Sequence, residues 1–157
     1  MDAERRLDEW WHPDRVRITP DPLVRLGTAR KRVLNLRLAY LEAHGRIPRV
    51  CLYALAPLRG QPACSFAIAR EYADGMGWRV SAEGCITDRL STPAPIRRPG
   101  WTWALRMVRA GHADGVVALT HTAVSRHLAE YEFNLDLMDF YGGFVALVTP
   151  ETAGTKR

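Results

Sequence analysis

The sequence lacks the features that mark several common classes of protein. None of its apolar runs approaches the roughly 20 residues that a membrane-spanning helix needs, and its first residues lack the apolar core of a secretory signal. We therefore expect an intracellular protein. The three cysteines, Cys51, Cys64 and Cys85, are odd in number and form no CxxC pair. This argues against a disulfide framework and against a zinc site, and favours buried, hydrophobic cysteines.

Lysine is scarce. Only Lys31 and Lys156 are lysines among the 22 basic residues, and the formal net charge is +5. Residues 1–49 hold eleven basic against seven acidic residues, which accounts for most of this excess. Arginine suits bidentate contacts to phosphate, so one interpretation is a nucleic-acid surface; the other is a solvated helix face. The candidate nucleic-acid contacts are Arg30, Lys31, Arg32, Arg37, Arg97 and Arg98.

The order of apolar segments predicts an α/β fold. Residues 49–55 form a short apolar run that ends before Pro57 and is typical of a buried parallel strand. Further strands are expected at 78–82 (with a short continuation at 85–87), 115–120 and 144–148, and helices at 62–75, 101–110 and 124–141. This alternation predicts a three-layer, mostly parallel sheet with helices on both faces. We expect a helical extension over 1–48, the α/β domain over 49–151 and a frayed tail over 152–157.

The extension is expected to hold a short helix over residues 2–11 and a longer one that starts at Pro22 or Thr28 and ends at His44. In the longer helix Leu34, Leu38 and Leu41 form one apolar stripe. We expect this stripe to pack either on the α/β domain or on a second copy of the chain. The second alternative predicts a homo-oligomer through the amino-terminal helices, to which Trp10 and Trp11 add apolar surface.

Motifs for nucleotide, metal and hydrolase chemistry are missing. The sequence has no GxGxxG, GxxxxGK[ST], HExxH or GxSxG, and its histidines lack metal-ligand spacing, so we expect no cofactor and no metal. An acidic strip on the last predicted helix is interpreted as a solvated face; it consists of Glu130, Glu132, Asp136 and Asp139. Trp101 and Trp103 begin a helix beside Arg97 and Arg98. Core packing of these rings is favoured over stacking on nucleobases.

From Arg49 to Glu151 the order of short motifs resembles the catalytic domain of the serine recombinases (resolvases and invertases). Tyr53 stands in the first strand, where the family has the tyrosine of Tyr-x-Arg-x-Ser. Asp88-Arg89-Leu90-Ser91 and Arg98-Pro99-Gly100-Trp101 are similar to the Asp-x-x-Ser loop and the Arg-Pro-Gly-Leu segment that follows it. The resemblance implies a resolvase-like fold, with Tyr53, Ser91, Arg98 and Arg126 as remnants of the recombinase site.

The departures from the family pattern lie at reactive positions. In these recombinases a serine attacks a DNA phosphodiester and arginines stabilise the transition state. This sequence has Pro57 at the nucleophile, Leu55 at an arginine, and Thr122-Ala123 in place of an Asp-Arg pair. We therefore expect that the chain is not an enzyme, that no residue is catalytic, and that the domain serves as a self-associating binding or regulatory module.

Two other functions stay open. One is a DNA-binding protein that places the basic extension with Arg97, Arg98 and Arg126 on phosphates. The other is a small-ligand enzyme that uses the loop from Asp88 to Arg98, where no nucleophile or base pair is visible. We expect no membrane partner and no obvious small-molecule substrate.

Overall fold

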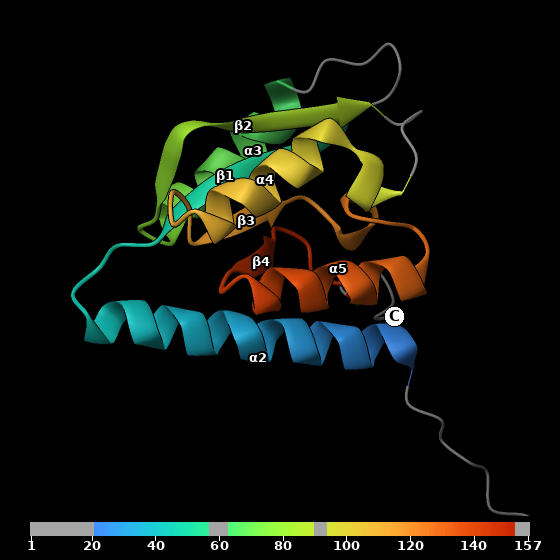
Figure 1. Cartoon of the computed structure of the whole chain (residues 1–157), viewed down its shortest axis with the longest axis horizontal. Coiled ribbons are helices and arrows are strands. Elements are labelled where there is room, and N and C mark those ends of the chain that lie inside the picture. The colour runs from blue at the N-terminus through green and yellow to red at the C-terminus, as the bar shows by residue number, and fades with distance from the viewer. Residues whose placement is uncertain (1–20, 57–62, 90–93, 153–157) are drawn as a thin grey trace, which may run out of the picture.

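The computed structural model describes residues 21–56, 63–89 and 94–152 (Figure 1). The helix predicted over residues 2–11, with Trp10 and Trp11, lies outside this part of the chain. So do Pro57, Ser91 and the tail from residue 153.

The four strands of the described chain form one parallel sheet in the order β2-β1-β3-β4. They are β1 (Arg49–Ala56), β2 (Arg79–Arg89), β3 (Gly115–Ala118) and β4 (Phe144–Leu147). Every residue of β3 and β4 is buried, as expected for short strands covered on both faces. The predicted α/β class with a parallel sheet is confirmed.

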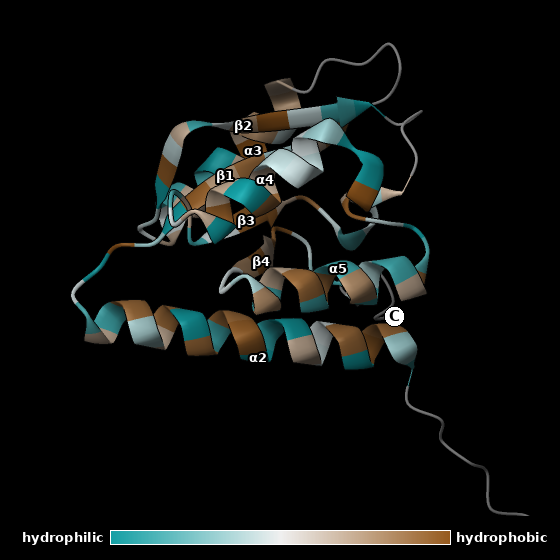
Figure 2. Cartoon of the chain, in the orientation of Figure 1, coloured by the Kyte–Doolittle hydropathy of each residue, from teal (hydrophilic) through white to brown (hydrophobic). Residues whose placement is uncertain are grey.

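Helices cover both faces of the sheet, and β1 shows why. Its side chains alternate: Val50 and Leu52 pack with α2 (Pro22–Ala43) and α3 (Ala63–Gly75), whereas Cys51 and Tyr53 pack with α4 (Pro99–Arg109) and α5 (Leu128–Phe140). Figure 2 shows brown, apolar positions along the strands and alternating stripes on the helices. The predicted three layers are confirmed, with α2 as part of one layer.

Helix α2 lies beside α5 and along β4 (Figure 1). It begins where the Asp21 carboxylate accepts a hydrogen bond from the Leu23 N–H (2.9 Å) with Pro22 at the first helical position. It ends before Gly45, whose φ of 65° favours glycine. The predicted stripe is used within the chain, because Leu34 and Leu41 are buried in the core. Within the described residues, no helix is long and apolar enough to cross a membrane.

Two predicted elements differ from the structure. The strand expected at 78–82 with a short continuation at 85–87 is one strand over Arg79–Arg89, although a register shift against β1 and a positive φ at Glu83 (58°) interrupt its pairing. The helix expected from Val124 begins at Leu128, because a short 3₁₀ turn (η2, His121–Ala123) and Ser125 precede it. The Ser125 hydroxyl accepts a hydrogen bond from the His127 N–H (3.1 Å) and so organises this turn.

Candidate functional site

The carboxyl end of the sheet is organised around Asp88. One carboxylate oxygen accepts hydrogen bonds from the Tyr53 hydroxyl (2.9 Å) and the Trp101 N–H (2.8 Å), and the other accepts one from the Gly100 N–H (2.9 Å). A carboxylate from β2 thus caps the amino terminus of α4, where unpaired N–H groups favour negative charge. The anion-binding position at this helix end is filled by the protein itself.

Gly100 is required by this arrangement. A Cβ atom at this position would lie 2.7 Å from the Asp88 carboxylate and 2.8 Å from the Ile86 side chain. The close approach of α4 to the end of β2 therefore explains why this position of the Arg-Pro-Gly segment is a glycine.

Arg98 joins two loops at this end of the sheet. Its side chain is buried, and one terminal nitrogen donates to the carbonyl oxygens of Val124 (2.8 Å) and Ala123 (3.0 Å). The same nitrogen lies 3.4 Å from the Tyr53 hydroxyl. The guanidinium thereby ties the segment before α4 to the segment that connects β3 to α5.

Tyr53 is a fixed hydrogen-bond donor in this cluster. Burial raises the pKa of its hydroxyl, the Arg98 hydrogen bond lowers it, and the Asp88 charge raises it, with a net upward shift. The hydroxyl therefore stays protonated at neutral pH and positions Asp88.

The structure brings together only some of the predicted site residues. Tyr53 and Arg98 are in contact, Arg126 is exposed in the turn before α5, and Ser91 lies outside the described residues. Arg97 is exposed in the 3₁₀ turn η1 (Pro95–Arg97). Whether these residues are remnants of a recombinase site stays a prediction.

The loops that Arg98 joins carry positive charge. We call the exposed side chains of Arg97 and Arg126, on segments 94–98 and 119–127, the cationic rim. Neither segment contains an acidic residue. At this end of the sheet, Asp88 is buried and already holds three donors.

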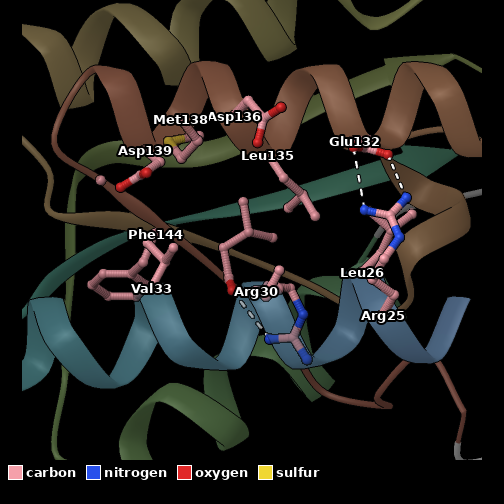
Figure 3. Close-up of a pocket in the computed structure, with 13 residues that line it drawn as sticks. Arg25, Leu26, Arg30, Val33, Glu132, Leu135, Asp136, Met138, Asp139 and Phe144 are labelled. Carbon is pink, nitrogen blue, oxygen red and sulfur yellow. Dashed lines mark hydrogen bonds and ion pairs between the residues drawn. The ribbon is translucent and has the colours of Figure 1, made fainter. Parts of the chain in front are cut away.

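A second cluster of charges lies between α2 and α5 (Figure 3). Arg25 pairs with Glu132 at 2.8 Å and Arg37 with Asp139 at 2.9 Å, on either side of a cavity of about 90 Å³. The hydrogen bond from Arg25 lowers the pKa of Glu132. The acidic strip is solvent-exposed at Glu132 (40%) and Asp139 (50%), as interpreted from the sequence, but α2 lies alongside α5 and pairs these two carboxylates with arginines.

Arg30, also on α2, belongs to a network of buried hydrogen bonds. Its guanidinium donates to both carboxylate oxygens of Glu151 (2.5 and 3.0 Å) and to the carbonyl oxygen of Val145 (3.2 Å), and the Tyr131 hydroxyl donates to Glu151 (2.6 Å). Burial raises the pKa of Tyr131. Sequence reasoning missed this network, although Arg30 stands one turn from Leu26 and one from Leu34, on the apolar side of its helix.

These contacts narrow the candidate nucleic-acid residues without testing them. Arg30 and Arg98 are buried, and the Arg37 guanidinium is engaged by Asp139. The side chains of Lys31, Arg32 and Arg97 are exposed. The net basic character of the extension is thus partly neutralised inside the chain.

No protein-family model and no curated protein sequence matches the chain. The solved structures that are similar to it include two catalytic domains. The N-terminal catalytic domain of TP901-1 integrase shares 20% identity over 64% of this chain and 77% of its own, with a TM-score of 0.55. The C-terminal catalytic domain of ISC1926 TnpA, an IS607-like serine recombinase, shares 18% over 66% and 72%, also with a TM-score of 0.55.

The chain has the fold of the serine recombinase catalytic domains. The resemblance drawn from the order of motifs is confirmed at the level of the fold. These comparisons also contradict the prediction that the chain is not an enzyme, because both similar structures are catalytic domains. That prediction depended on Pro57, which lies outside the described residues, and on Leu55 and Thr122-Ala123, which the structure describes.

Proposed function

We propose that this recombinase-fold domain binds the phosphate backbone of DNA through its cationic rim. The observation that carries the proposal is the bridge made by Arg98. Because its buried guanidinium holds the carbonyl oxygens of Ala123 and Val124, the loops that present Arg97 and Arg126 are fixed to one another. Two exposed guanidiniums on a rigid support suit contact with neighbouring phosphates.

Charge favours the rim over α2 as the main DNA contact. On α2 the guanidiniums of Arg25, Arg30 and Arg37 are paired with carboxylates of the same chain. The rim segments themselves contain no acidic residue, and the neighbouring Glu130 carboxylate accepts a hydrogen bond from the Ser125 hydroxyl (2.9 Å). Lys31 and Arg32 remain exposed on α2 and provide a matched comparison.

The similarity in fold also supports DNA as the ligand. Its similar structures come from an integrase and from a serine recombinase, and serine recombinases act on DNA phosphodiesters. Contacts to the backbone alone give sequence-independent affinity that falls steeply with salt.

A mobility-shift titration of the chain with duplex DNA at two salt concentrations tests the proposal. We expect a shifted band at low salt that weakens strongly as salt rises, on duplexes of unrelated sequence alike. Unchanged migration at low salt would remove DNA as the ligand.

We also propose self-association through the outer side of the α2–α5 pair. The apolar stripe predicted on α2 packs into the core. Other apolar side chains of the two helices are exposed, namely Leu36 (61%), Tyr40 (58%) and Phe140 (83%). The Arg37–Asp139 pair joins the two helices beside these residues, so they flank one seam. An exposed apolar group of this kind marks an interaction surface.

Sedimentation velocity tests self-association. We expect Phe140→Asp to shift the chain toward monomer, whereas Ile47→Asp, at another exposed apolar position (48%), leaves the distribution unchanged. A monomeric intact chain at high micromolar concentration would reject this second proposal.

A further inference from the structure

A second site lies at the opposite end of the sheet from the cationic rim. A hollow of about 600 Å³ opens between the carboxyl-terminal half of α4 and the first half of β2. Its floor and walls include Ala82, Met107 and Ala110, and its polar lining includes Glu83 and Arg106. This volume falls in the range that small-molecule sites occupy.

The walls of the hollow are fixed by internal hydrogen bonds. The Ser81 hydroxyl donates to the carbonyl oxygen of His112 (3.1 Å), and Arg49 donates to that of Gly111 (2.7 Å). Glu83 is held at a φ of 58°, in the left-handed region that a glutamate rarely adopts. Backbone strain of this kind persists only where the surroundings enforce it.

Trp103 and Arg106 lie one turn apart on α4, and both side chains are exposed to a ligand in the hollow. Trp103 is 44% exposed, whereas Trp101, two residues earlier, is completely buried. The Arg106 side chain is exposed and makes no hydrogen bond or ion pair with any residue that the structure describes. Both side chains line the hollow.

We infer that this hollow binds a nucleotide. The indole face of Trp103 suits stacking with a base, the guanidinium of Arg106 suits a phosphate, and the carboxylate of Glu83 suits the hydroxyl groups of a sugar. The three groups border one apolar hollow and together match the base, phosphate and sugar of a single nucleotide. The nucleotide is either free or part of a single strand, and the site is independent of the cationic rim.

Calorimetric titration of the full chain tests the inference with two probes, AMP and a single-stranded hexanucleotide. We expect saturable binding of at least one probe. Arg106→Ala and Trp103→Leu should each weaken it by about tenfold or more. Arg109→Ala is the matched control, since Arg109 lies on the same helix, stacks on Tyr141 (5.6 Å to the ring centroid) and does not line the hollow.

The two probes separate the two sources of the nucleotide. Binding of AMP alone assigns a free nucleotide, and binding of the hexanucleotide alone assigns a strand. Absence of binding by both probes at millimolar concentration would overturn the inference, as would binding that both lining variants leave intact. The rim double variant Arg97→Gln/Arg126→Gln should leave AMP binding unchanged, because neither residue lines the hollow.

Discussion

Arg30 of α2 and Glu151, which follows β4, form an ion pair whose side chains are 4% and 1% exposed. The pair joins residues that lie 121 positions apart and fastens the amino-terminal helix to the far edge of the sheet. Gly27 permits this close approach, since a Cβ atom there would lie 2.8 Å from the Glu151 carboxylate. Helix α2 is therefore held by a specific polar contact as well as by its apolar stripe.

We predict that Arg30→Met destabilises the fold by about 3–5 kcal/mol, because it leaves the Glu151 carboxylate buried without its cation. Urea denaturation followed by circular dichroism measures the change. Arg25→Met is the control: it removes the exposed pair with Glu132 and should alter stability little. Equal effects of the two substitutions would show that the buried pair does not hold α2.

Stability should fall in acid through Glu151. Burial alone would raise the pKa of this carboxyl, but hydrogen bonds from Arg30 and Tyr131 outweigh burial and lower the pKa. A carboxyl whose pKa is lower in the folded state stabilises the fold above its unfolded pKa of about 4.3 and loses this contribution as pH falls through the folded pKa. The difference in unfolding free energy between the intact chain and Glu151→Gln should therefore be largest above about pH 5 and shrink in stronger acid. A constant difference across this range would contradict the assignment.

Gly100→Ala should cost about 1–3 kcal/mol, because the added Cβ meets the Asp88 carboxylate and Ile86 and pushes α4 away from its cap. Gly75→Ala is the matched control, since a Cβ there has nothing within 4 Å. Thermal unfolding of both variants gives the comparison. A melting temperature for Gly100→Ala equal to that of the control would mean that the Asp88 cap tolerates displacement.

The layers of the fold were predictable because they follow from local patterns. The β1 run, bounded by Pro57, and the all-apolar β3 segment indicate buried strands without knowledge of their neighbours. The exact start of α5 was not predictable, because it depends on the Ser125 turn and on carbonyl oxygens that bind Arg98. Strand β2 was predicted as two short pieces, because an irregularity in its pairing with β1 breaks the alternation of its side chains.

The candidate site was less predictable than the fold. The motif resemblance named Tyr53 and Arg98, which are in contact. It did not show that Arg98 is buried and acts on backbone oxygens, since this depends on contacts across the sheet. The pairing of arginines on α2 with acids on α5 was equally hidden, because each helix alone has a charged face that is typical of solvent exposure.

The salt dependence of DNA binding by two double variants tests the central proposal most directly. Arg97→Gln/Arg126→Gln removes the cationic rim, and Lys31→Gln/Arg32→Gln removes the same charge from α2. We predict that the rim variant binds duplex DNA more weakly than the intact chain does. The negative slope of log K against log salt should become shallower by about 1.8, which corresponds to two lost phosphate contacts. The α2 variant should bind as the intact chain does. A rim variant with unchanged affinity and slope would contradict the account.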